Sequence, residues 1–298
     1  MLNKENIRLG IAPIGWTNDD IPELGGENTF QQCISEMALA GFTGSEVGSK
    51  YPADPQELKK ALDLRGLVIC NQWFSAFTAS RPMAEVEKEF RDQMDFLRVV
   101  GSDVIGPSEQ TRSSQGNLDI GVAAGKAELS GEEWKKMTTG FNRLGRTAKD
   151  EGFKLCFHHH MGTGVQTPVE TERFLNDTDP SLVYLTFDSG HFAYTGADPV
   201  AELKKFISRV GHVHLKDVRP DIRKMAVGED WPFMKAVREG VFTVPGDGSV
   251  DFPSIFKLLG EADYRGWMVV EAEQDPAKAN PFEYALKARD YIREQTGL

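Results

Sequence analysis

The chain has 298 residues, of which 40% are hydrophobic and 27% charged, and its formal net charge is −11. This composition is typical of a globular protein, and no apolar run approaches the roughly 20 residues that a membrane span needs. The acidic balance argues against a protein that binds nucleic-acid phosphates, and the polar first nine residues are unlike a secretion signal, so we expect a cytoplasmic location. The three scattered cysteines, Cys33, Cys70 and Cys156, are expected to be reduced thiols.

Short apolar runs alternate with segments of helical spacing along the whole chain. Glycines often follow the helical segments, and Ser130 with Glu133 forms a capping-box pattern at the start of one of them. This alternation predicts βαβ units and a parallel sheet. In chain order, strands are expected at 7–14, 42–47, 67–74, 103–106, 153–158, 182–188, 210–215 and 266–271, and helices at 29–40, 55–64, 82–100, 130–151, 167–176, 199–209, 252–261 and 281–295.

Eight strand–helix units predict a (β/α)8 TIM barrel, an α/β fold that forms a single domain over residues 1–298. An open, doubly wound sheet is the alternative. Two long connections, 107–129 and 216–250, follow strands. In a barrel they lie at the carboxyl ends of the strands, on the catalytic face, where we expect them to cover a substrate.

Polar side chains gather at the ends of the predicted strands, which a barrel brings to one place. Three consecutive histidines end the fifth strand, and strand alternation puts His158 and His160 on one face and His159 on the other. A lone histidine on a strand is more often a core or surface residue, so the prediction of a metal site depends on four consecutive strands that each end in His, Asp or Glu. Such ligands suit Mn²⁺, Co²⁺, Fe²⁺ or Zn²⁺. The remaining candidates are Trp16, Glu46, Asn71, Gln72, Trp73, Ser108, Glu109, Asp188, His191, His212, His214, Glu271 and Glu273.

The aromatic residues at strand ends have two readings. Trp16 and Trp73 either pack in the core or form walls for a sugar-like ring, and the sequence favours neither. No phosphate-binding GxxxxGK[ST] loop and no Gly-x-Ser-x-Gly elbow occurs, which argues against a P-loop protein and a serine hydrolase.

Several motifs resemble the xylose-isomerase-like barrel superfamily over nearly the full chain. They are Asp188-x-x-His191, His212-x-His214 followed by Asp217, the PGDGSVDF turn at 245–252, and Glu271. Within that superfamily, IAPIGWTNDDIPELGG at 11–26 and LCFHHHMGTGVQTP at 155–168 are similar to the inosose dehydratase family. The resemblance implies a hydro-lyase of myo-inositol catabolism that removes water from 2-keto-myo-inositol (scyllo-inosose). It also implies one Mn²⁺ or Co²⁺ ion and, as an accessory, glutathione.

The resemblance implies roles for individual residues. Asp188, His214 and Glu271 are expected metal ligands. The superfamily's epimerases place a glutamate at the end of strand five, where this chain has His158. The fourth ligand is therefore His158, His160 or an additional water, and we expect His158. The expected base is Glu271 or Lys216, and the expected acid is His191 or His160. Ring hydroxyls would be held by Glu46, Gln72 and Arg219, and the ring would lie between Trp16 and Trp73.

Three other functions fit parts of the sequence. A ketose or keto-polyol epimerase or isomerase would use the same metal site and the same first step. An abasic-site endonuclease needs more metal ligands and a basic groove, which the charge disfavours. A non-catalytic sugar-binding protein would lack a metal. We therefore expect a small cyclic keto-polyol as partner, no nucleic acid and no membrane, and leave a homodimer or higher homo-oligomer open.

Overall fold

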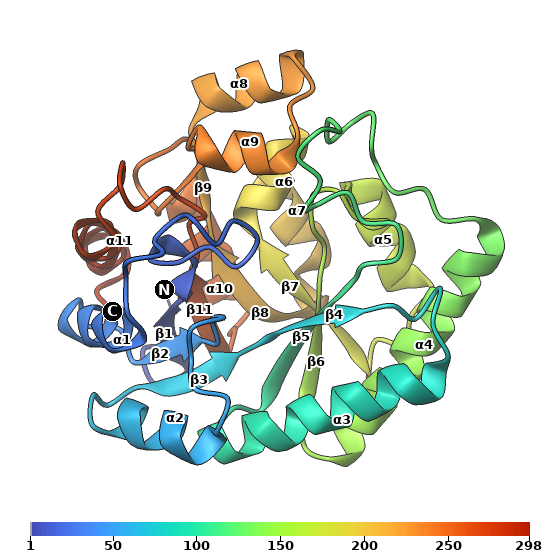
Figure 1. Ribbon diagram of the computed structural model, residues 1–298, viewed down its shortest axis with the longest axis horizontal. Coiled ribbons are helices and arrows are strands. Elements are labelled where there is room, and N and C mark those ends of the chain that lie inside the picture. Colours follow the sequence, from blue (N-terminus) through green and yellow to red (C-terminus); the bar gives the residue numbers. More distant parts are fainter. Residues whose placement is uncertain (1) are drawn as a thin grey trace.

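The computed structural model describes residues 2–298. One sheet of nine strands forms its centre, in the order β3-β2-β1-β11-β8-β7-β6-β5-β4, and all neighbouring strands are parallel. The helices surround this sheet (Figure 1). The strands are β1 (Ile7–Ile11), β2 (Gly44–Glu46), β3 (Val68–Asn71), β4 (Trp73–Ala76), β5 (Val104–Glu109), β6 (Lys154–His158), β7 (Val183–Asp188), β8 (Val210–Leu215) and β11 (Gly266–Val270).

The third predicted strand is broken at Gln72 into β3 and β4. β3 pairs with β2, β4 pairs with β5, and the Gly106 N–H donates to the Gln72 carbonyl at the break (3.0 Å). One interrupted stretch of chain therefore reaches both neighbours and joins the two edges of the sheet. The predicted single-domain (β/α) barrel is confirmed, and the open-sheet alternative is wrong.

Side chains that cap the first turn mark the starts of several helices. Ser130 and Glu133 form the expected capping box at α4, and Thr167 and Glu170 form a second one at α5. Each box satisfies backbone N–H groups that the first helical turn leaves free. The helices are α1 (Phe30–Leu39), α2 (Pro55–Asp63), α3 (Met83–Val100), α4 (Gly131–Asp150), α5 (Pro168–Asn176), α6 (Ser189–Thr195), α7 (Pro199–Phe206), α8 (Pro220–Gly228), α9 (Phe233–Arg238), α10 (Phe252–Glu261) and α11 (Pro281–Thr296), with 3-10 turns at Pro13–Gly15 and Ile207–Arg209.

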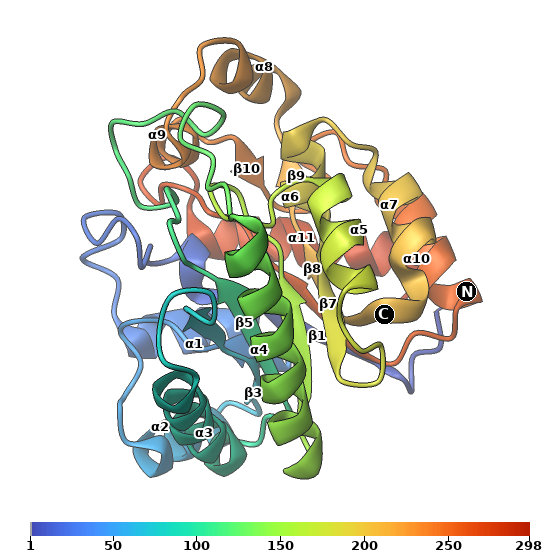
Figure 2. The ribbon, with the colours of Figure 1, turned by 90° about the vertical axis from the view of Figure 1, so that its right-hand side faces the viewer.

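Both long connections lie at the carboxyl ends of the strands, as predicted (Figure 2). The second contains structure that periodicity did not reveal: α8, α9 and a small antiparallel pair of β9 (Asp217–Val218) and β10 (Phe242–Thr243). The first is held against it, because the Ala123 and Ala124 N–H groups donate to the carboxylate of Asp230 (2.8 and 3.0 Å).

Apolar side chains form two large clusters. One fills the barrel and the space between the sheet and the helices. The other lies over the carboxyl ends of the strands, and we call it the cover core: Ile21, Leu24, Val122, Met161, Tyr194, Val218, Ala226, Trp231, Phe233, Met234, Ala236, Val237, Val241 and Phe242.

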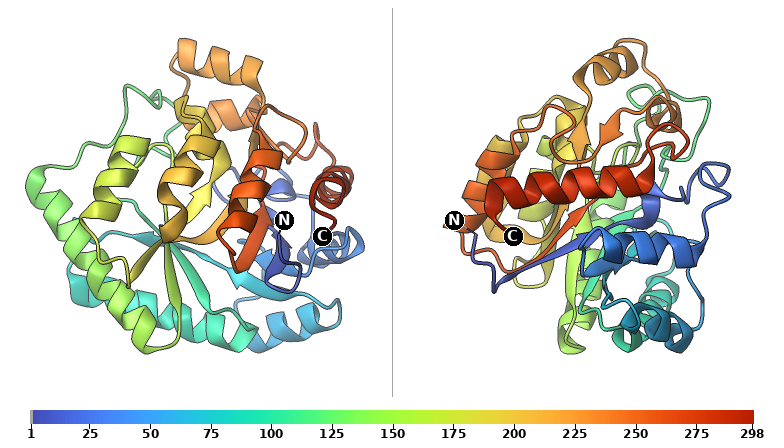
Figure 3. Two further views of the ribbon diagram at one scale, coloured as in Figure 1. Left: turned by 180° about the vertical axis from the view of Figure 1, so that it is seen from behind. Right: turned by 90° about the vertical axis from the view of Figure 1, so that its left-hand side faces the viewer.

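The two ends of the described chain lie close together, beside α1 and α11 (Figure 3). Lys4 Nζ donates to the carbonyl of Gly297 (2.5 Å). The three cysteines are buried free thiols, as expected. Among the described residues, no helix is long and apolar enough to cross a membrane.

Candidate active site

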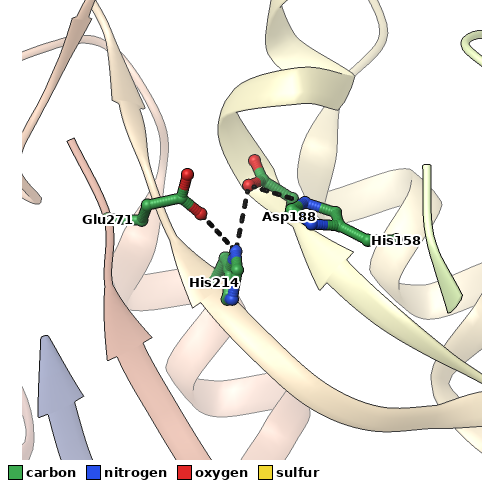
Figure 4. Close-up of side chains that lie close together, drawn as sticks. All are labelled: His158, Asp188, His214 and Glu271. Carbon is green, nitrogen blue, oxygen red and sulfur yellow. Dashed lines mark ion pairs between the residues drawn. The ribbon is translucent and has the colours of Figure 1, made fainter. Parts of the chain in front are cut away.

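Four side chains converge at the carboxyl ends of the strands, where each belongs to or directly follows a different strand (Figure 4). His158 Nε2 lies 3.4 Å from Asp188 Oδ2, and that oxygen lies 3.5 Å from His214 Nδ1. The same His214 nitrogen contacts Glu271 Oε2. Candidate ligand atoms from all four residues lie within 4.8 Å of one another. We call this set the ligand group.

The converging atoms of the ligand group share a second property. His158 Nε2, Asp188 Oδ2, His214 Nδ1 and Glu271 Oε2 are all buried and have no hydrogen-bond partner. A buried polar atom without a partner is costly, and four of them pointing at one place are unlike ordinary packing. Two imidazoles and two carboxylates suit a divalent first-row metal ion, so the residues present fit a metal.

Each carboxylate of the ligand group has its other oxygen tied. Asp188 ends β7 and caps α6, and its Oδ1 accepts from the His191 N–H (2.8 Å). Glu271 Oε1 lies 2.9 Å from Lys216 Nζ. Burial works to raise the pKa of Glu271, but the charges of Lys216 and His214 lower it to about 2. Both groups are therefore anionic and present one free oxygen each.

Glu46, predicted to hold substrate, also contacts the ligand group. Its Oε1 lies 3.0 Å from His214 Nε2 and accepts from Asn71 Nδ2 (2.8 Å). Burial opposes ionisation of Glu46, but the neighbouring His214 and His212 keep its pKa well below the ordinary value. A carboxylate on the far nitrogen of a ligating histidine fixes the ring orientation.

Lys216 lies behind the ligand group and is fully buried. Its Nζ is 2.9 Å from Glu271 Oε1, 2.9 Å from Glu273 Oε1 and 3.4 Å from Asp188 Oδ2. Burial would lower the pKa of Lys216, but these three carboxylates raise it, so the group is an ammonium.

A second group of acid–base side chains adjoins the first and consists of His160, His191 and Glu273. His160 Nδ1 lies 2.8 Å from the Met161 carbonyl, and the His160 ring centre is 4.0 Å from that of His191. Burial lowers the pKa of His160 well below its usual value, and the charges of His158 and Lys216 act in the same direction. Burial and the charge of Glu271 raise the pKa of Glu273 to about 7 against the opposing effect of Lys216.

A cavity of about 140 Å³ opens onto both groups. Three members of the ligand group, His158, His214 and Glu271, form part of its lining, together with Trp73, His160 and Glu273. Two loops also reach it, 16–29 through Asp19 and Asp20, and 107–129 through Gln115. The remaining lining residues are Ala12, Pro13, Ile14, Glu46, Val47 and Asn71.

Comparison with known proteins places the chain. Residues 34–295 match the xylose isomerase-like TIM barrel family. A curated relative called inosose dehydratase from Clostridium beijerinckii is 57% identical over the full length of both chains, and inosose dehydratase 2 from Bacillus cereus is 53% identical, also over both full lengths. The chain belongs to the inosose dehydratases of the xylose isomerase-like TIM barrel family. It is a hydro-lyase, as the resemblance implied.

More distant solved structures share the fold of this inosose dehydratase family member. A probable 3-DHS dehydratase AsbF from Bacillus anthracis has a TM-score of 0.71 at 15% identity, covering 96% of this chain and 98% of that one. An L-ribulose 3-epimerase has a TM-score of 0.69 at 17% identity, covering 98% and 95%. Their similarity is one of architecture.

Three side chains predicted to touch substrate lie outside the cavity lining. Trp16 is 1% exposed, packs in the barrel core, and donates its indole N–H to Glu36 (2.6 Å). Arg219 is bound by Asp247 (2.8 Å) and by the Gly240 carbonyl (2.7 Å). Gln72 lies between two lining residues, Asn71 and Trp73, so strand alternation turns it away.

The remaining predictions divide between the two groups. His158 joins the ligand group and His160 the acid–base group, whereas His159 faces away and packs on Phe192 with ring centres 4.0 Å apart. His191 is fully buried behind His160. The sequence marks Glu273 and Asn71 only as polar residues at strand ends. Asp19, Asp20 and Gln115 lie in loops, which carry no periodic signal that would point to the cavity.

Proposed function

We propose that this protein removes water from 2-keto-myo-inositol to give 3D-3,5/4-trihydroxycyclohexane-1,2-dione, and that it uses one divalent ion, Mn²⁺ or Co²⁺. The relatives' name supplies the substrate. The observation that carries the metal proposal is the convergence of four buried, unpartnered atoms from His158, Asp188, His214 and Glu271. A cation there would satisfy all four.

His158 is the proposed strand-five ligand. Its Nε2 belongs to the converging set and has no partner, whereas His160 Nδ1 is engaged by a backbone carbonyl. His158 would then stand where the superfamily's epimerases place a glutamate. Replacing an anionic ligand by a neutral one leaves the site with a higher net positive charge, which favours an electrophilic metal.

The elimination requires removal of the proton next to the ketone and departure of the hydroxyl one carbon further. A divalent ion held by the ligand group would supply Lewis acidity to the ketone, and this would make the neighbouring C–H bond more acidic. The protein must supply a base for that proton and an acid for the hydroxyl.

His160 is the side chain best placed to be the base. The Met161 carbonyl is only an acceptor, so His160 Nδ1 carries the hydrogen and Nε2 keeps its lone pair. His160 lines the cavity, so that lone pair is available to a ligand there. The bases expected from the sequence are less suitable. Lys216 is an enclosed ammonium, and Glu271 has Oε1 held by Lys216 while its Oε2 belongs to the ligand group.

Glu273 is the proposed acid. It lines the cavity, belongs to the same group as His160 and His191, and has one oxygen held by Lys216. The α proton passes to His160, the C–O bond breaks, and the departing hydroxyl takes the proton of Glu273 and leaves as water. The enol that remains tautomerises to the dione.

The test is dehydration of scyllo-inosose, followed by the near-ultraviolet absorbance of the dione. Chelated protein should be inactive and should recover with Mn²⁺ or Co²⁺. Asp188→Ala should neither recover nor retain metal by elemental analysis. Asp198→Ala is the matched control, because Asp198 likewise caps a helix, α7, but lies outside the cavity lining. Full activity of metal-free Asp188→Ala protein would contradict the metal proposal.

The same assay separates dehydration from epimerisation. An epimerase would convert a ketose without producing the ultraviolet-absorbing dione, although it shares the first proton transfer. Running the assay with and without glutathione tests the accessory role that the family resemblance implies.

A further inference from the structure

The cavity that adjoins the ligand group is rich in acceptors and contains no cationic side chain from lysine or arginine among its lining residues. Asp19, Asp20, Glu46, Glu271 and Glu273 supply carboxylates. A phosphate or carboxylate on a substrate would face these anions, whereas a neutral hydroxyl offers each of them a hydrogen. Selectivity among neutral polyols then requires acceptors at fixed places.

Asn71 supplies one such acceptor from the barrel. The side chain is 3% exposed, and its Nδ2 donates to Glu46 Oε1 (2.8 Å). Because a carboxylate only accepts, this bond fixes which end of the amide is nitrogen. The other end, Oδ1, is buried and has no partner. Gly106 leaves the space for this amide, since a Cβ there would lie 2.7 Å from Asn71 Nδ2.

Gln115 supplies a second acceptor from the loop above the cavity. Its Nε2 donates to Asp20 Oδ2 (2.9 Å), which again fixes the amide, and its Oε1 is buried without a partner. The loop is held close to Gly162, because the Ser114 N–H donates to the Gly162 carbonyl (2.9 Å). A Cβ on Gly162 would lie only 2.8 Å from the backbone nitrogen of Gln115. The glycine after the histidine run therefore helps to fix Gln115.

We propose that Asn71 and Gln115 are specificity-determining residues that accept hydrogen bonds from two ring hydroxyls of the substrate. The inference rests on the proposed function, which gives the ligand its polyol character. Both residues line the cavity, each has a neutral amide oxygen without a protein partner, and the two come from elements far apart in the chain. Two acceptors at fixed positions set the orientation in which a ring with several similar hydroxyls binds.

The test compares scyllo-inosose with monodeoxy analogues that each lack one ring hydroxyl. A net hydrogen bond contributes about tenfold in affinity at most when both partners are neutral. We expect Gln115→Leu to raise KM about tenfold with kcat within about threefold. In the unaltered protein, an analogue that lacks the hydroxyl bound by Gln115 should have a higher KM than scyllo-inosose. In Gln115→Leu this difference in KM should disappear, because that hydroxyl no longer has a partner. Asn71→Leu should abolish the difference for another analogue, which lacks a different hydroxyl.

Controls separate this role from a structural one. Gln56→Leu makes the same chemical change at an exposed glutamine of α2, outside the cavity lining, and should leave every ratio between analogues unchanged. Since Asn71 also holds Glu46, the metal content of Asn71→Leu is measured by elemental analysis, and its binding of unreactive myo-inositol by calorimetry gives a readout independent of turnover.

The outcomes are distinguishable. If the unaltered protein does not dehydrate scyllo-inosose, the proposed function fails. If it does, but Gln115→Leu and Asn71→Leu discriminate among the deoxy analogues as the unaltered protein does, the inference about these two residues is overturned.

Discussion

At the scale of single residues, each of the two carboxylates in the ligand group has one oxygen held by the protein and one oxygen without a hydrogen-bond partner. Asp188 gives Oδ1 to the backbone of α6, and Glu271 gives Oε1 to Lys216. The remaining oxygens, Oδ2 and Oε2, have no hydrogen-bond partner. A carboxylate held by one oxygen cannot rotate freely, so the free oxygen is fixed in advance. Preorganisation of this kind lets a metal bind without reordering its ligands.

Another buried carboxyl group at this end of the barrel serves structure. Glu109 at the end of β5 is fully buried and accepts from the Thr78 N–H (3.0 Å), the Thr78 hydroxyl (2.6 Å) and the Thr111 N–H (3.2 Å). Burial raises the pKa of Glu109 above its ordinary value, although these hydrogen bonds oppose the shift. The folded state therefore binds this proton more tightly than the unfolded state does.

The sign of this shift predicts a pH dependence. Stability from protonated Glu109 is fully present below the unfolded pKa, about 4.3, and is lost as the pH rises through the higher folded pKa. Glu109→Gln lacks this titration. As the pH rises from about 4 toward neutrality, the unaltered protein loses this stability and the variant does not. We therefore expect the free energy of unfolding of Glu109→Gln to increase relative to that of the unaltered protein over this range. Parallel urea titrations at several pH values measure the difference, and a difference independent of pH would contradict the assignment.

At the scale of elements, α6 sets the position of Lys216. The helix starts directly after Asp188, and its second residue, Gly190, lies against the Lys216 stem. A Cβ on Gly190 would lie 2.4 Å from Lys216 Cγ. In addition, the Ser189 hydroxyl donates to the Lys216 carbonyl (2.8 Å). The short helix therefore carries His191, is capped by Asp188, and confines the ammonium that neutralises the carboxylates.

Gly190→Ala tests this contact. The added methyl group must displace the Lys216 stem, which is enclosed on all sides, and overpacking of this kind costs about 1–3 kcal/mol. We expect a lower free energy of unfolding and weaker Mn²⁺ binding, because Lys216 holds Glu271. Gly131→Ala is the control, since nothing lies within 4 Å of its Cβ position. Urea unfolding and metal titration measure both, and equal behaviour of the two variants would show that Lys216 accommodates the methyl group.

Elements with strong periodicity could be predicted from the sequence. Which side chains of the third strand point into the barrel could not be predicted. The run at 67–74 is apolar on both faces, as expected of a parallel strand buried between barrel and helices, so the sequence does not say which residues point inward. Asn71 points to the cavity and Gln72 does not. In the fifth strand, by contrast, alternation separated His159 from His158 and His160 correctly. Trp16 and Arg219 follow strands, and neither reaches the cavity lining.

At the scale of the molecule, the barrel carries a second packing unit above its catalytic end. The cover core draws residues from the 16–29 loop, the 107–129 loop and the 216–250 connection. The first two of these segments also contribute Asp19, Asp20 and Gln115 to the cavity. From the third segment, the ring centre of Phe233 lies 5.0 Å from that of His160. Closure of the cavity is therefore linked to apolar packing outside the barrel.

A cover with its own core should loosen as a unit. Met234→Ala removes a fully buried side chain of the cover core, and such a truncation costs about 2–5 kcal/mol. If the cover opens separately, amide exchange should accelerate in 110–129 and 217–243 while β6 and β7 stay protected, since local opening needs less free energy than global unfolding. Met225→Ala, at a 47% exposed position of α8, should change neither region. Equal acceleration in the barrel strands would show that cover and barrel unfold together, and the cavity would then open only with the whole fold.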